Sequence, residues 1–321
     1  MPRRTPRILV IGSTGQIGSE LTPALRRSYG VENVVACWHT RKPSATLKEG
    51  PTEHLDATKR GEVEKVFGKY EVGAIYHLGA VLSAMGEKNP ELAWNVNVDG
   101  LRNVLEAARK NGVRRVFWPS SMAVFGKGAP RDNTPQHAPL VPTTIYGITK
   151  VAGELLCNYY LKRYGLDVRS LRFPGIISSE TLPGGGTTDY AVEIFYEAIR
   201  SRRYTCFLKA DATLPMMYMP DCISATIQLM EARVADVKIR TSYNVTGMSF
   251  SPEELVSEIR KRVPEFKCDY KPDFRQQIAE SWPGSLDDGA AKSDWGWKPR
   301  YTLSSMTDDM FAKLGKRLRS A

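Results

Sequence analysis

The sequence has few of the residues that would indicate a metal centre or a disulfide framework. Its five cysteines and four histidines are scattered over 321 residues, and no two cysteines form a CxxC pair. Scattered thiols of odd number are typical of a reducing compartment, and this spacing predicts neither paired disulfides nor a zinc site. We therefore expect no bound metal ion.

Long hydrophobic runs and concentrated charge are also absent. No apolar run approaches the roughly 20 residues that a membrane span requires, and residues 1–6 are basic without an apolar signal region. The formal net charge is +10, but the basic residues are dispersed, and the cluster at residues 200–203 has no interleaved aromatic side chains. We expect a cytoplasmic protein with a solvated basic surface and no nucleic-acid or membrane partner.

The chain instead alternates short apolar segments with helical ones. Hydrophobic residues at 42% and charged residues at 25% are typical of an ordinary globular protein. Strands are expected at residues 7–11, 33–37, 53–56, 74–78, 116–118 and 168–171, and helices at 16–28, 90–110 and 146–164. This alternation predicts an α/β fold, a doubly wound, Rossmann-like parallel sheet with helices on both faces.

The pattern changes after residue 173, where loops rich in glycine and proline, such as residues 182–186, separate shorter elements. Residues 242–245 are expected to return to the main sheet as a strand. We therefore expect a dinucleotide-binding domain over residues 1–173, with a return segment near 215–247. A smaller C-terminal substrate-binding lobe is expected from residues 174–214 and 248–321.

A glycine-rich turn follows the first strand, and its sequence is Gly12-Ser13-Thr14-Gly15-Gln16-Ile17-Gly18. Glycines allow a tight turn and close backbone approach, and the N-terminus of the following helix attracts phosphate. The position between strand and helix predicts a pyrophosphate site. The GxxGxxG spacing resembles that of the short-chain dehydrogenase/reductase superfamily.

The acidic residue that would hold the adenosine ribose, about 20 residues further on, is missing. The region reads Trp38-His39-Thr40-Arg41-Lys42 and contains no carboxylate. Arg41 and Lys42 can accommodate a 2′-phosphate, or they can simply point into water. Residue chemistry alone therefore leaves NAD and NADP open.

Tyr146 and Lys150 are four residues apart on a predicted helix, so their side chains lie on one face. Free tyrosine titrates near pH ~10, and a neighbouring cation such as Lys150 would help it to act as a base. Ser120 and Ser121 end the preceding strand. We expect Tyr146 to take a hydroxyl proton while Ser121, with Ser120 as the alternative, orients that oxygen.

Several longer segments resemble the short-chain, metal-independent L-threonine 3-dehydrogenases of the extended, epimerase-like branch. They are residues 117–126, 171–177, 183–190, 214–219 and 281–285, and the likeness covers nearly the whole chain. It implies NAD-dependent oxidation of the β-hydroxyl of L-threonine to 2-amino-3-oxobutyrate, in a homodimer. Trp38 departs from this pattern, because family members usually have an aspartate there.

The resemblance also implies roles for individual residues. The catalytic residues would be Ser121, Tyr146 and Lys150. NAD would be bound by Gly12, Thr14, Gly15, Gln16, Ile17, Gly18, Asp56, Leu78, Gly79, Ala80, Asn97, Tyr146, Lys150, Pro174 and Ile176. L-Threonine would be bound by Ser83, Ser121, Tyr146, Thr187, Thr188 and Trp282. Within this set, Asp56 is expected near the adenine amino group, and Asn97 is expected to brace the segment beneath the cofactor.

Two other functions are compatible with parts of this pattern. A nucleotide-sugar epimerase or dehydratase shares the fold, the glycine turn and the tyrosine–lysine pair. It would need a larger sugar-nucleotide pocket, which the Gly-Gly-Gly-Thr-Thr-Asp loop does not resemble. A non-catalytic NAD(P)-sensing protein would have no need of a complete set of Ser121, Tyr146 and Lys150.

Overall fold

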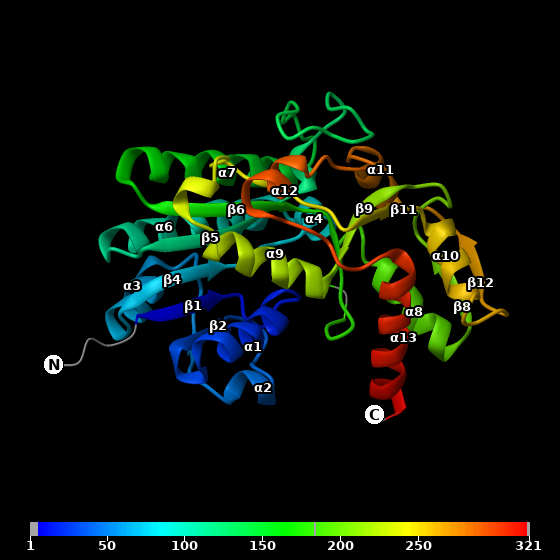
Figure 1. Cartoon of the computed structure of the whole chain (residues 1–321), viewed down its shortest axis with the longest axis horizontal. Coiled ribbons are helices and arrows are strands. Elements are labelled where there is room, and N and C mark those ends of the chain that lie inside the picture. The colour runs from blue at the N-terminus through cyan, green and yellow to red at the C-terminus, as the bar shows by residue number, and fades with distance from the viewer. Residues whose placement is uncertain (1–5, 183, 320–321) are drawn as a thin grey trace.

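The computed structural model describes residues 6–182 and 184–319. In this part of the chain, seven parallel strands form one sheet in the order β10-β6-β5-β4-β1-β2-β3, with helices above and below it (Figure 1). The strands are β1 (Arg7–Ile11), β2 (Val34–Trp38), β3 (Thr52–His54), β4 (Val72–His77), β5 (Arg115–Ser121), β6 (Asp167–Phe173) and β10 (Tyr243–Asn244). Each expected strand is present, so the predicted sheet is confirmed.

The helices cover the two faces of the sheet as the alternation predicts. On one face lie α1 (Gly18–Tyr29) and α9 (Met219–Glu231), over apolar residues such as Val10 and Phe117. On the other face lie α3 (Arg60–Lys69), α6 (Gly100–Lys110) and α7 (Ile145–Tyr164), over residues such as Leu9 and Val116. Because neighbouring residues of a strand point to opposite faces, the continuous apolar strands fill both layers.

Two of the predicted helices differ from the structure by more than one residue. The first helix begins at Gly18 rather than residue 16, because the glycine turn continues through Ile17. The single helix expected over residues 90–110 consists of α5 (Pro90–Trp94), a π-helical turn (Asn95–Asp99) and α6. The π-helical turn contains Asn97, whose side chain bonds the backbone of Val81.

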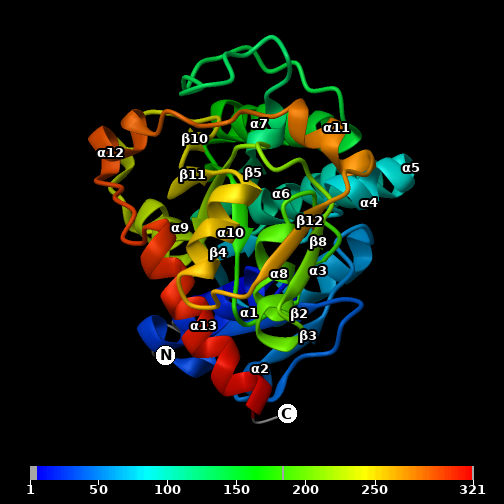
Figure 2. The same ribbon diagram turned by 90° about the vertical axis from the view of Figure 1, so that its right-hand side faces the viewer.

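A second group of elements packs beside the main sheet, on the right of Figure 1 and facing the viewer in Figure 2. A small sheet has β9 (Leu214–Tyr218) between β7 (Gly175–Ile177) and β11 (Met248–Phe250), and β8 (Arg203–Cys206) pairs with β12 (Lys267–Tyr270). Around them lie α8 (Tyr190–Arg200), α10 (Pro252–Arg260) and α13 (Leu303–Arg319), with a shared apolar core.

The remaining elements are short. They include α2 (Ala45–Lys48), α4 (Ser83–Lys88), α11 (Phe274–Glu280) and α12 (Gly289–Trp295), and tight turns at Val31–Asn33, Met122–Val124 and Val234–Asp236. Pro183, in the predicted glycine-rich loop, and residues 1–5 lie outside the described residues. The division into a domain and a lobe stays a prediction.

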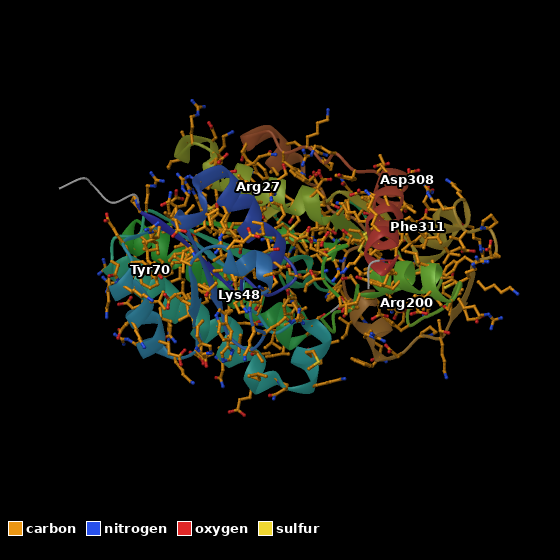
Figure 3. All side chains as sticks on the ribbon, turned by 90° about the horizontal axis from the view of Figure 1, so that it is seen from below. Arg27, Lys48, Tyr70, Arg200, Asp308 and Phe311 are labelled. Atoms are coloured by element: carbon orange, nitrogen blue, oxygen red, sulfur yellow. The ribbon has the colours of Figure 1, made fainter. Side chains whose placement is uncertain are left out.

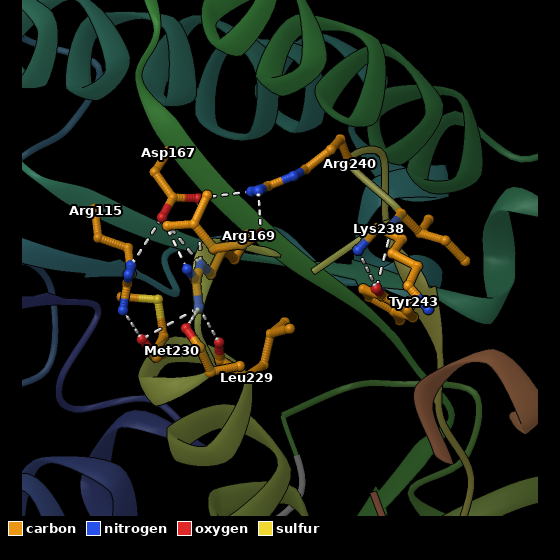
Figure 4. Close-up of polar contacts among 11 residues, drawn as sticks. Arg115, Asp167, Arg169, Leu229, Met230, Lys238, Arg240 and Tyr243 are labelled. Carbon is orange, nitrogen blue, oxygen red and sulfur yellow. Dashed lines mark hydrogen bonds and ion pairs between the residues drawn. The ribbon is translucent and has the colours of Figure 1, made fainter. Parts of the chain in front are cut away.

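Asp167 anchors α9 to the sheet at the amino end of β6 (Figure 4). Its carboxylate pairs with Arg115 and Arg169 at 2.9 Å and with Arg240 at 2.8 Å. The buried Arg169 also donates to backbone carbonyls at the C-terminus of α9, including Leu229 at 2.5 Å. A cation at this end of a helix satisfies its unpaired carbonyls. The cluster therefore stabilises the sheet at the amino ends of its strands, opposite the end where the glycine turn lies.

None of the helices in the described ranges is long and apolar enough to cross a membrane. The five cysteines are free thiols, and all except Cys268 are buried.

Candidate active site

The glycine turn lies at the carboxyl end of β1, where the chain connections of the sheet diverge toward β2 on one side and β4 on the other. Ligands of open α/β sheets bind at such a switch point. The amides of Gly12 and Ser13 both donate to the carbonyl of Cys37 at 3.0 Å, which holds the turn beside the end of β2. Gly12 has a φ of +85°, in the left-handed region that favours glycine.

Close backbone approach explains two of the glycines in the turn. A Cβ atom on Gly12 would lie 2.8 Å from the amide nitrogen of Gly79, and one on Gly18 would lie 2.2 Å from the carbonyl oxygen of Gly12. Ile17, which caps α1, offers no side-chain hydrogen bond to the helix amides. The compact turn and the uncapped helix N-terminus together fit a dinucleotide pyrophosphate.

A cavity of about 140 Å³ lies between the ends of β4, β5 and β6 and the small sheet. It brings together residues that are up to 266 positions apart, from Gln16 to Trp282. The predicted site residues that line it are Gln16, Ile17, Leu78, Ala80, Ser83, Ser121, Tyr146, Lys150, Pro174, Ile176, Thr187, Thr188 and Trp282. Gly12, Thr14, Gly15, Gly18, Asp56, Gly79 and Asn97 lie outside its lining.

Tyr146 and Ser121 both line this cavity, and the Ser121 hydroxyl is close enough to influence the phenol. The Ser121 oxygen also accepts the amide of Ala123 at 3.2 Å, so its own proton is free to be donated to an oxygen in the cavity. Burial raises the pKa of Tyr146 to about 12, and the Ser121 hydroxyl opposes this shift. The pair has the geometry of a proton acceptor next to a donor that stabilises its charged form.

Lys150 lies beneath Tyr146 on the same face of α7. Its ammonium group donates to the carbonyl of Pro119 at 2.6 Å and lies 4.5 Å from the ring centre of Trp118 and 5.6 Å from that of Tyr146. Burial lowers the pKa of Lys150 to about 7. We expected Lys150 to depress the pKa of Tyr146, but burial dominates in this arrangement and the pKa of Tyr146 rises instead.

The two serines at the end of β5 have different partners. Ser120 donates to Glu154 at 2.6 Å, and Glu154 forms a buried, two-pronged ion pair with Arg172, both contacts being 2.8 Å. Sequence reasoning missed Glu154 and Arg172. The signal was present, because Glu154 is four residues after Lys150 and therefore on the same buried face of the helix.

Hydroxyl groups and one indole form the opposite wall of the cavity. Ser83 and Thr187 are buried and hydrogen-bonded to each other at 3.0 Å. The indole Nε1 of Trp282 is buried and has no hydrogen-bond partner among the described residues. An unpaired buried donor of this kind is costly unless a ligand satisfies it.

Asp189 is a residue of this wall that sequence reasoning missed. Its Oδ2 atom accepts the amides of Gly185 and Gly186 at 2.8 and 2.7 Å, and burial raises its pKa. An aspartate shortly after a glycine run commonly binds nearby backbone amides, and this was the available signal. Asp189 thus shapes the glycine-rich loop and gives the cavity a carboxylate.

Asn97 and Asp56 lie outside the lining of the cavity and hold loop segments after the strands in place. Asn97 bonds both backbone groups of Val81, at 2.8 and 3.1 Å, and the hydroxyl of Thr149 at 3.0 Å. Asp56 accepts the amide and the hydroxyl of Thr58 at 3.0 and 2.7 Å, and its other oxygen lies 3.6 Å from His39. Asn97 therefore links α7 to the segment after β4.

Comparisons with known proteins agree with this geometry. Residues 8–246 match the model of the NAD dependent epimerase/dehydratase family. An uncharacterised epimerase/dehydratase of Staphylococcus aureus is 46% identical, over 97% of each chain. A GalE-like L-threonine dehydrogenase from Cupriavidus necator is 52% identical with a TM-score of 0.93, over 96% of this chain and 100% of that one. A monomeric L-threonine 3-dehydrogenase from a metagenome is 46% identical, also with a TM-score of 0.93, over 97% and 99%.

Proposed function

Because the chain belongs to the NAD-dependent epimerase/dehydratase family, we propose that it is an L-threonine 3-dehydrogenase. It oxidises the β-hydroxyl of L-threonine to the ketone of 2-amino-3-oxobutyrate, with NAD as the acceptor. The observation that carries this proposal is the cavity, in which Ser121, Tyr146 and Lys150 face a wall of small polar groups. The likeness to solved L-threonine dehydrogenases supports it.

NAD, when bound, supplies the nicotinamide ring that accepts a hydride. The turn from Gly12 to Gly18 would hold the pyrophosphate through its amides and the N-terminus of α1. Lys150 would bond the nicotinamide ribose, and Asp56 would lie near the adenine. The further residues proposed for this site are Thr14, Gly15, Gln16, Ile17, Leu78, Gly79, Ala80, Asn97, Tyr146, Pro174 and Ile176.

The proton leaves the substrate through Tyr146. As a phenolate, Tyr146 takes the proton of the β-hydroxyl, and Ser121 donates a hydrogen bond to the same substrate oxygen. Ser121 can do so because its oxygen already accepts the amide of Ala123. Positive charge on Lys150 favours the phenolate, and burial works against it, so the two residues titrate in dependence on one another.

The opposite wall is suited to the amino-acid part of L-threonine. Ser83, Thr187 and the unpaired indole of Trp282 are donors for an α-carboxylate, with Thr188 beside them. Asp189 is the counter-charge for the α-ammonium. The small polar groups of this lining favour an amino acid over the alternative substrate, a nucleotide sugar.

L-Threonine deuterated at Cβ tests the reaction directly. We expect the deuterium to appear in the reduced cofactor and the turnover rate to fall when hydride transfer limits it. Conversion of a nucleotide sugar, with no threonine-dependent reduction, would favour the epimerase or dehydratase alternative instead. Binding of the dinucleotide without any turnover would favour the sensor.

We also propose a homodimer, formed through the outer faces of α5 and α7. Large apolar side chains are exposed there, including Leu92 at 46%, Leu155 at 59% and Tyr159 at 51%. Such a patch is typical of an interface, although one similar enzyme is described as monomeric. Sedimentation of the native protein and of a Leu155→Glu variant tests this, because only the native protein should sediment as a dimer.

The proposed enzyme acts in the cytoplasm, where the free cysteines would stay reduced. In this proposal residues 1–173, with a return segment near 215–247, form the dinucleotide-binding domain. Residues 174–214 and 248–321 form the substrate-binding lobe.

A further inference from the structure

A second cavity, of about 510 Å³, lies on the outer side of the glycine turn. Thr14 of the turn lines it, and so do residues of α1, of the loop between β2 and α2, and of α13. Figure 1 shows α1 and α2 adjacent at the bottom of the molecule. The cavity is therefore next to the turn that would hold the pyrophosphate, on the side where β2 ends.

Basic side chains surround this cavity. Arg27 on α1 and Arg41 and Lys42 in the following loop line it, and none of the three has a partner among the described residues. Arg317 also lines it and donates to the carbonyl of Ser179 at 3.2 Å. Figure 3 shows Arg27 on the underside of the molecule.

Two carboxylates line the same cavity, Glu20 and Glu180. Glu20 accepts a hydrogen bond of 2.6 Å from Ser178, and burial raises its pKa. Four cations therefore face two carboxylates. The cluster has an excess of positive charge and three cations free to bind an anion.

The loop that presents Arg41 and Lys42 is held in place from below. The buried Arg26 donates to the carbonyls of Leu47 at 2.8 Å, Pro51 at 3.0 Å and Val34 at 3.3 Å. Ser44 caps α2 by accepting the amide of Leu47, and Pro43 is buried. A loop fixed at these points presents its cations in a defined direction, at less entropic cost than a free loop would.

The end of β2 lacks the carboxylate that would reject a phosphate. Trp38 is the last residue of β2 and contacts His54 edge-on, with ring centres 5.0 Å apart. Asp56, an acidic group after the adjacent β3, is hydrogen-bonded to Thr58 and lies within 4 Å of His39 and Lys59. In dinucleotide sites a carboxylate here binds the ribose 2′-hydroxyl, whereas an arginine accommodates a 2′-phosphate.

We propose that this basic cavity is a subsite for the 2′-phosphate of an adenine dinucleotide, formed by Arg41, Lys42 and Arg27. The enzyme then uses NADP as an acceptor beside NAD. This inference rests on the proposed function only in that a dinucleotide occupies the glycine turn. The basic cluster determines whether that dinucleotide can carry a 2′-phosphate, as NADP does and NAD does not.

Direct binding tests the subsite without any turnover. Isothermal titration of the full chain, in a phosphate-free buffer, compares 2′,5′-ADP with AMP, which lacks only the 2′-phosphate. We expect 2′,5′-ADP to bind at least roughly tenfold more tightly, the effect of one hydrogen bond to a charged group. This advantage should shrink as salt is added, because the cations are exposed. Inorganic phosphate as a competitor shows whether any phosphate suffices.

Substitutions show which side chains cause the tighter binding of 2′,5′-ADP. Arg41→Ala with Lys42→Ala should abolish the advantage of 2′,5′-ADP and leave AMP binding nearly unchanged. Lys48→Ala is the matched control, because Lys48 is an exposed cation on the adjacent α2 that does not line the cavity. It should leave the advantage intact. Trp38→Asp should reverse the preference by placing a negative charge at the ribose.

Equal affinity for 2′,5′-ADP and AMP would overturn the proposal, as would an equal loss in the Lys48→Ala control. Displacement of 2′,5′-ADP by inorganic phosphate at comparable concentration would show a general anion site and would also overturn it. A tight 2′,5′-ADP complex without threonine oxidation would refute the proposed function but still support the subsite. Threonine oxidation with NAD alone, with equal affinity for 2′,5′-ADP and AMP, would support the proposed function but refute the subsite.

Discussion

Ser120 donates a hydrogen bond of 2.6 Å to the buried carboxylate of Glu154, which Arg172 neutralises. Ser121, the next residue in the chain, instead lines the cavity together with Tyr146. Successive residues of a strand point to opposite sides, so one serine belongs to the buried ion pair and the other to the reacting groups.

This difference predicts opposite consequences for the two serines. Ser121→Ala should lower kcat by about 10²–10³-fold, the range for loss of one donor to a reacting oxygen, with the melting temperature almost unchanged. Ser120→Ala should leave kcat within a few-fold but destabilise the protein by about 1–3 kcal/mol, since Glu154 loses a buried partner. Steady-state kinetics and urea unfolding of both variants measure this, and a reversed pattern would make Ser120 the catalytic serine.

Tyr146→Phe removes only the phenolic oxygen from the cavity. We expect turnover to fall by roughly 10²–10⁴-fold, the contribution of a positioned general base, while the affinity for the dinucleotide stays within a few-fold. Titration calorimetry gives the affinity and single-turnover kinetics give the rate. The role of Tyr146 is refuted by a variant that keeps more than a tenth of the native rate.

The pH dependence of stability follows from Lys150. Burial lowers its pKa to about 7, whereas the unfolded chain titrates near its ordinary ~10.4. Between these pH values the unfolded state binds a proton that the folded state does not, so Lys150 makes the free energy of unfolding rise with pH. Below about 7 and above about 10.4 its contribution should be constant.

Lys150→Met isolates this contribution, because the other titrating groups largely cancel in the difference. The native protein should gain stability relative to the variant as pH rises from 7 to 10, measured by urea unfolding at several pH values. A difference that does not change with pH would mean that the ammonium remains charged throughout. Activity should be lost in the variant at every pH.

Trp282→Phe tests the substrate wall, since it keeps most of the packing and deletes the unpaired Nε1–H donor. If that donor binds the α-carboxylate, KM for L-threonine should rise by about tenfold with kcat changed less. Ile278→Val, at a buried position on the nearby α11, is a packing control that should leave KM unchanged. An unchanged KM in Trp282→Phe would assign Trp282 to packing alone.

Much of the main sheet could be predicted because each buried parallel strand is a short apolar run between polar turns. The glycine turn follows from a similarly local signal, because it lies directly between the first strand and the first helix. Local signals do not specify the π-helical turn around Asn97, since the residues of α5 and α6 read as one continuous helix. Tertiary hydrogen bonds to Val81 accompany it, and these lie outside any short window of sequence.

The small sheet and the basic cavity were harder to foresee for a related reason. Pairing of β8 with β12 joins segments more than 60 residues apart, and its register depends on how the intervening elements pack. Arg27 and Arg317 likewise come from opposite ends of the chain to one cavity. Sequence patterns suggested Arg41 and Lys42 as phosphate ligands, but only the fold brings Arg27 to them.

The most direct test of the central claim is the appearance of reduced nicotinamide absorbance when the purified protein is mixed with L-threonine and NAD. We expect reduction that depends on L-threonine, yields 2-amino-3-oxobutyrate and disappears in Tyr146→Phe. No reduction with L-threonine, with either NAD or NADP as acceptor, would contradict the account, provided that the same preparation binds the dinucleotide.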